Sequence, residues 1–72
     1  MEFETKHINA LKRHAESVLA PFTVWRISKL GLAMFVEDCA NFATALNVKD
    51  RTEYTSGTEI KIFDNQLKRF VK

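Results

Sequence analysis

Residues 29–46 read KLGLAMFVEDCANFATAL, and the number of strands in the domain depends on how this stretch folds. The favoured interpretation makes residues 29–31 a turn, residues 32–36 a strand and residues 39–46 a helix. Asp38 is expected to cap that helix, because its side chain can accept a hydrogen bond from a backbone N–H of the first turn.

One long helix over the same stretch is the rival interpretation. Its apolar residues fit a helical stripe without a gap: Leu32, Phe35, Val36, Cys39, Phe42, Ala43 and Leu46. That helix would turn Leu30 and Met34 toward solvent and place Gly31 in its first turn, where glycine costs about 1 kcal/mol relative to alanine. Glu37 beside the expected cap also favours a helix that begins there, and Asn47 is suited to ending it.

Two elements are predicted before this stretch. Residues 22–28, FTVWRIS, are rich in β-branched and aromatic types and predict a strand. Residues 4–19 predict a helix, which Pro21 stops. The apolar stripe of that helix consists of Ile8, Leu11, Ala15, Val18 and Leu19.

The second half of the chain predicts a loop followed by a hairpin. Residues 48–57 are polar and rich in turn formers, so we expect a long loop there, with a short edge strand at residues 52–55. Residues 58–63 alternate well enough to predict a strand. Residues 64–65, Asp-Asn, predict a tight turn, and residues 67–71 are expected to pair back as the last strand.

These elements predict a small α+β fold in the order α-β-β-α-β-β. The 72 residues are expected to form a single domain, residues 1–72, because no linker divides them. We expect a mainly antiparallel sheet with the two helices packed on one face, where both apolar stripes would be buried.

Composition points to a soluble chain of the cytoplasm. The longest apolar run, residues 32–36, is far shorter than the roughly 20 residues of a membrane-spanning helix, and the N-terminus has no signal-peptide pattern. Cys39 is the only cysteine, so no internal disulfide can form. The net charge of +2 neither requires nor excludes a polyanionic partner.

No pattern of catalytic, metal-binding or cofactor-binding residues emerges. His7 and His14 lie seven positions apart on one helix, about 10 Å along its axis, which is too far to share a metal ion. No glycine-rich phosphate loop is present. Cys39 is expected to be a small apolar core residue. We therefore expect no enzyme activity, no cofactor and no metal site.

The aromatic residues suggest a protein-interaction module. Trp, Tyr and Arg are the preferred anchors of protein interfaces, and Trp25, Arg26 and Tyr54 are the candidate protein-binding residues. The chain would act as a small regulator, inhibitor or accessory protein. It would dock on a larger protein or on itself as a homo-oligomer such as a homodimer, and no membrane partner is expected.

Nucleic-acid binding is the alternative hypothesis. Seven basic residues are candidates for backbone contacts: Lys6, Lys12, Arg13, Lys61, Lys68, Arg69 and Lys72. Phe63 and Phe70 lie among the C-terminal ones, and aromatic rings interleaved with basic groups are typical of single-strand binding. The pI of 8.9 and the mixture of charges make this pattern weaker than in most nucleic-acid-binding domains.

Overall fold

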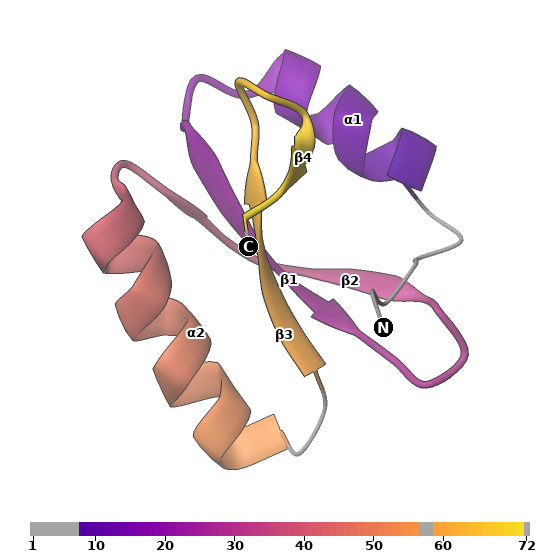
Figure 1. Cartoon of the computed structure of the whole chain (residues 1–72), viewed down its shortest axis with the longest axis vertical. Coiled ribbons are helices and arrows are strands. Elements are labelled where there is room, and N and C mark those ends of the chain that lie inside the picture. The colour runs from indigo at the N-terminus through magenta and orange to yellow at the C-terminus, as the bar shows by residue number, and fades with distance from the viewer. Residues whose placement is uncertain (1–7, 57–58, 72) are drawn as a thin grey trace.

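A computed structural model describes residues 8–56 and 59–71, without the side chains of residues 54–56. It confirms the α+β order α-β-β-α-β-β (Figure 1). The sheet has four strands in the order β2-β1-β3-β4, and each neighbouring pair is antiparallel. The elements are α1 (Ile8–Ser17), β1 (Phe22–Ile27), β2 (Ala33–Cys39), α2 (Phe42–Ser56), β3 (Glu59–Asp64) and β4 (Arg69–Phe70).

The stretch at residues 29–46 contains a turn, a strand and the start of a helix, so the rival long helix is wrong. Gly31 has a φ of 82°, a left-handed conformation that glycine adopts without steric cost. Its N–H donates to the Ser28 carbonyl at 3.0 Å, and the Ser28 N–H donates to the Leu32 carbonyl at 2.9 Å. This turn therefore reverses the chain between β1 and β2.

Helix α2 differs from its predicted bounds at both ends. It begins at Phe42, and its cap is Asn41, whose side-chain oxygen accepts from the Thr44 N–H at 2.8 Å. Asp38 does not cap it, because that carboxylate lies in β2 and accepts hydrogen bonds from other elements. The helix then runs to Ser56.

The loop predicted at residues 48–57 is wrong over residues 48–56, as is the edge strand at 52–55, because α2 continues through this region and Asn47 does not end it. Residue 57 lies outside the described residues. Asp50, Arg51 and Glu53 are exposed, while Val48 is buried against the sheet. Tertiary packing of one buried face stabilises a helix whose sequence resembles a loop. Within the described ranges, no helix combines the length and the apolar character needed to cross a membrane.

The two helices pack on opposite faces of the sheet, so the prediction that they share one face is wrong. Val24 packs into a core with Ala45 and Val48 of α2. The next residue in β1, Trp25, packs into a second core with Leu11 of α1. Successive side chains of a strand point to opposite faces, and apolar residues on both faces are typical of a strand covered on both sides. Figure 1 shows α1 and α2 on different sides of the crossing strands.

The last hairpin is confirmed, although β4 is short. Asp64 stabilises the turn, because its carboxylate accepts from the backbone N–H groups of Gln66 and Leu67 at 2.9 and 3.0 Å. In β4, Phe70 pairs with Phe63, and the Val71 N–H donates to the Ile62 carbonyl at 2.8 Å. The described part of β4 therefore covers only one end of β3.

A chain of polar side chains crosses the α1 face of the sheet. The Asp38 carboxylate lies 2.8 Å from the His14 ring nitrogen and accepts from the Thr23 hydroxyl at 2.7 Å. The Asn65 amide donates to the Thr23 hydroxyl at 2.8 Å and to the Ala20 carbonyl at 2.9 Å. These contacts join α1, the first two strands and the last turn.

Candidate functional site

Large apolar side chains are exposed in two groups and at two isolated positions. One group lies at the β1–β2 hairpin, and the other comprises Phe42 and Leu46 on α2. Clustered exposed apolar side chains often mark interaction sites, whereas single ones are common on any protein. The exposed residues are Leu19, Leu30, Leu32, Met34, Phe35, Phe42, Leu46 and Leu67.

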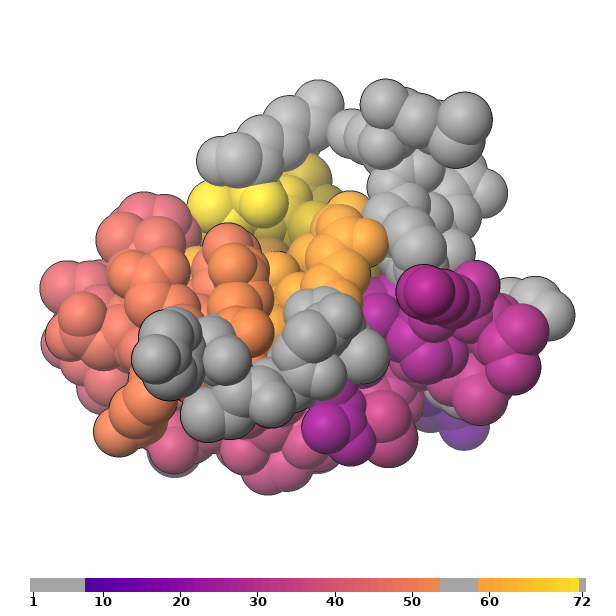
Figure 2. All heavy atoms as spheres, turned by 90° about the horizontal axis from the view of Figure 1, so that it is seen from below, coloured from indigo at the N-terminus to yellow at the C-terminus, as the bar shows by residue number. Residues whose placement is uncertain are grey.

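The α2 group lines an open groove of about 330 Å³ between α2 and the β3–β4 side of the sheet, which we call the α2–β3 groove. Figure 2 shows α2 lying against β3, with β4 beyond them. The residues that line the groove are Phe42, Leu46, Lys49, Glu53, Glu59, Ile60, Lys61, Ile62 and Val71.

Helical periodicity builds one wall of the groove. Phe42 and Leu46 are four residues apart, and Lys49 and Glu53 continue the same row, so all four lie along one side of α2. The sheet supplies the floor, because Ile60 and Ile62 of β3 point toward α2 and belong to the core beneath it.

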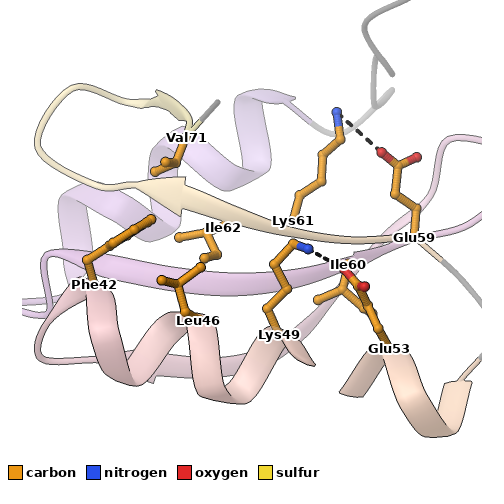
Figure 3. A pocket seen from close by; sticks show the side chains of 9 residues that line it. All are labelled: Phe42, Leu46, Lys49, Glu53, Glu59, Ile60, Lys61, Ile62 and Val71. Atoms are coloured by element: carbon orange, nitrogen blue, oxygen red, sulfur yellow. Dashed lines mark hydrogen bonds and ion pairs between the residues drawn. The ribbon is translucent and has the colours of Figure 1, made fainter. Parts of the chain in front are cut away.

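The groove changes character along its length. Phe42, Leu46 and Val71 make one end apolar, and Lys49 and Glu53 follow along the helix wall (Figure 3). On the helix wall, Lys49 forms an ion pair with Glu53.

On β3, the side chains of Lys61 and Glu59 alternate with Ile60 and Ile62 and point to the face opposite to α2 (Figure 3). Lys61 lies 3.6 Å from Glu59, and its ammonium group is also 5.0 Å from the centre of the Phe70 ring. The Lys49–Glu53 ion pair is partly exposed, and such pairs contribute little to stability.

Of the predicted protein-binding residues, neither Trp25 nor Arg26 lines this groove. Trp25 is only 8% exposed and belongs to the core under α1, with its ring 5.4 Å from that of His14. Arg26 lies on the other face of the sheet, where its guanidinium donates to the Met34 sulfur at 3.3 Å. Tyr54 belongs to α2, and its side chain lies outside the described part of the structure.

The described basic residues of the nucleic-acid hypothesis are spread over three elements and a turn. Lys12 and Arg13 are exposed on α1, and Arg69 is exposed on β4. Lys68 forms an ion pair with Glu16 at 3.0 Å. Lys6 and Lys72 lie outside the described residues, and Lys61 lies on β3 beside Glu59.

Sequence reasoning missed most of the groove because it treated residues 48–57 as a loop. Lys49 and Glu53 are four residues apart, a spacing typical of ion pairs on a helix. Together with the row from Phe42 to Leu46, this spacing was a signal that the helix continues. Nothing in the sequence indicated that this row faces Ile60 and Ile62.

Cys39 ends β2, and it does not lie at a helix N-terminus. The side chain is 2% exposed in the core under α2, as expected for a small apolar residue. Burial raises the pKa of the Cys39 thiol above its ordinary value, and the carboxylates of Glu37 and Asp38 raise it further. A buried, protonated thiol is a poor nucleophile.

We expect Cys39 to react at least about tenfold more slowly with the disulfide reagent DTNB at pH 8 in the native protein than in urea. Both the burial of the thiol and its raised pKa lower the concentration of accessible thiolate. Stopped-flow absorbance at several urea concentrations measures the rate. Equal rates in native and unfolded protein would show that Cys39 is accessible.

The geometry of the groove is suited to binding. It combines exposed apolar surface with paired charges, and within residues 8–56 and 59–71 no three His, Cys, Asp or Glu side chains gather closely enough to hold a metal ion. Comparison with protein-family models, curated proteins and solved structures finds no match to this chain.

Proposed function

We propose that this chain is a non-catalytic protein-interaction module that binds its partner through the α2–β3 groove. The observation that carries the proposal is that Phe42 and Leu46 are exposed at the apolar end of the α2–β3 groove. The exposed fractions of these two residues are 39% and 40%. Such a patch loses contact with water when a partner covers it, at about 25 cal/mol per Å² of apolar area.

Two features support the proposal that this chain is an accessory protein of the cytoplasm. Cys39 has no second cysteine to pair with, which fits a reducing compartment. A chain of 72 residues buries little surface by itself, so binding to a larger protein would also stabilise it.

The charges favour a protein partner over a nucleic acid at this groove. Glu53 would repel phosphates at one end. Elsewhere, Lys68 is paired with Glu16, which lowers the positive potential beside the last hairpin.

Selection of random twelve-residue peptides displayed on phage tests the proposal. We expect the wild-type protein to enrich peptides that contain large apolar residues, because Leu46 and Phe42 offer an apolar contact. Selected peptides are then synthesised, and fluorescence anisotropy gives their Kd. The Leu46→Glu variant should weaken binding at least about tenfold, since it places a charge in the apolar end of the groove.

Leu19→Glu is the matched control, because Leu19 is an exposed leucine outside the groove and its replacement should leave the Kd unchanged. Circular dichroism checks that both variants are folded. Selected peptides that bind Leu46→Glu as well as wild type would contradict the groove. Salt-sensitive binding of DNA or RNA oligonucleotides without peptide binding would favour the nucleic-acid alternative.

A further inference from the structure

We infer that this chain forms a two-fold homodimer through one exposed face of its β1–β2 hairpin. This hairpin face consists of Arg26 on β1, Met34 and Glu37 on β2, and Leu32 directly before β2. The inference goes beyond the proposed function, because none of these residues lines the α2–β3 groove.

The strand register places these side chains on the same side of the sheet as α2. Val24 of β1 belongs to the core under α2, and side chains two apart on a strand share a face, so Arg26 points to this side as well. Directly opposite residues of an antiparallel pair also share a face. Glu37 pairs with Val24 and Met34 pairs with Arg26, so both lie on the α2 side of the hairpin.

Helix α2 covers only the other end of this side of the hairpin. Val24 is 0% exposed, whereas Leu32 and Met34 are each 42% exposed. The Leu32 carbonyl accepts from the Ser28 N–H at 2.9 Å, so Leu32 continues the pairing of the strands and shares the face of Met34, two residues later. Figure 1 shows the hairpin extending away from α2. Two neighbouring large apolar side chains are therefore open to a partner.

The charges of the hairpin face complement one another across a two-fold axis. Arg26 is half-buried and donates to the Met34 sulfur at 3.3 Å, and Glu37 is exposed. Among the described residues, neither Arg26 nor Glu37 has an ion-pair partner. In a two-fold contact, residue i of one copy meets residue j of the other, and the reverse. An axis that passes between Arg26 and Glu37 therefore brings each guanidinium against a carboxylate of the other copy.

This self-complementarity favours a second copy over an unrelated protein, because the hairpin face itself carries both members of the charge pair. The same contact covers Leu32 and Met34 of both copies, and burial of apolar area contributes about 25 cal/mol per Å². A chain of 72 residues buries little surface by itself, so the dimer would also stabilise the fold.

Pairing of two β2 edges is a poorer geometry for the dimer. Strand β2 lies at the end of the described sheet, but its register with β1 shifts between Val24 and Trp25. A bulge of this kind bends an edge strand and interrupts regular pairing. Phe35 is exposed but points to the α1 side, where its ring lies 5.3 Å from that of His14. The contact therefore uses the face of the hairpin on the α2 side.

Sedimentation equilibrium of the whole chain tests the inference with two single variants. The protein is measured at about 10 µM to 1 mM, because a small interface associates weakly. We expect the wild-type mass to approach twice the 8.3 kDa of one chain at the upper end of this range. Arg26→Glu and Glu37→Arg should each raise the dimer dissociation constant at least about tenfold, since two attractive charge pairs become repulsive.

A mixture of the two single variants should restore the dimer. In the mixed pair, both contacts join a carboxylate to a guanidinium, so an equimolar mixture should associate within about threefold of wild type. The double variant Arg26→Glu, Glu37→Arg exchanges the two charges and should also dimerise. Such a rescue identifies a contact between copies, because one chain cannot repair a structural defect within another.

Lys12→Glu is the matched control, because it makes the same charge change as Arg26→Glu at an exposed position of α1 and should keep the wild-type dissociation constant. Circular dichroism checks folding, and Glu37→Arg alters an exposed residue, so its loss of affinity is required even if Arg26→Glu is unfolded. A mass of one chain at every concentration, a dimer that Glu37→Arg does not weaken, or folded variants whose mixture stays monomeric would overturn the inference. A dimer weakened by Leu46→Glu and not by Glu37→Arg would place the contact at the groove and also overturn it. The phage-selected peptides test the proposed function separately in every case.

Discussion

Replacing Phe63 by alanine is expected to lower the free energy of unfolding by about 3–5 kcal/mol. Phe63 is 0% exposed in the core under α1, and its ring meets that of Phe70 edge-on at 5.3 Å. Its removal would leave a cavity between β3, β4 and α1. A domain of 72 residues has a stability of roughly 4–11 kcal/mol, so this substitution should remove a large share of it.

Urea unfolding followed by far-ultraviolet circular dichroism measures this loss. Phe42→Ala is the matched control, because Phe42 is 39% exposed at the rim of the groove and its truncation should cost only about 1–2 kcal/mol. Similar losses in the two variants would contradict the position of Phe63 at the centre of the core.

Replacing Asp38 by alanine is expected to cost about 2–3 kcal/mol, the second-largest effect. The carboxylate accepts a hydrogen bond from Thr23, which is 0% exposed, and it holds the His14 ring of α1. Without it, the Thr23 hydroxyl would be buried without its acceptor, and α1 would lose a polar contact with β2. The cost of an unsatisfied buried donor exceeds the net contribution of an ordinary hydrogen bond.

The neighbouring Glu37 is exposed, so Glu37→Ala provides a control that should change stability by less than about 0.5 kcal/mol. A double-mutant cycle isolates the Thr23–Asp38 term, because Thr23→Val should cost much less once Asp38 has been replaced. Equal stability of the Asp38→Ala and Glu37→Ala proteins, or strict additivity in the cycle, would show that this hydrogen bond contributes little.

Local patterns in the sequence were sufficient for the number and order of the elements. The strand at residues 22–28 and the turn around Gly31 were predicted correctly, because β-branched residues and a left-handed glycine act within a few positions. The hairpin at Asp64 was also predicted, since an aspartate side chain bonds to backbone groups two and three residues ahead.

Contacts between residues far apart in the sequence determined the features that these local patterns could not predict. The carboxylate of Asp38 was expected to cap a helix, yet it accepts from Thr23 and contacts His14, fifteen and twenty-four positions away. Residues 48–56 have the composition of a loop, yet they are helical because Val48 and Ala45 find a buried position against the sheet. The free energy gained from such tertiary contacts exceeds the small differences in helix propensity between residues.

The sequence by itself determined an α+β chain of six elements in the order α-β-β-α-β-β. Only the tertiary structure decided that Val24 and Trp25 face different helices and that the helix row from Phe42 to Glu53 lies beside Ile60. The physical reason is that a pattern of apolar residues specifies which side of an element is buried, but not what covers it. The proposed binding groove could be identified only from the tertiary structure, because it lies between a helix and a strand that meet only after folding.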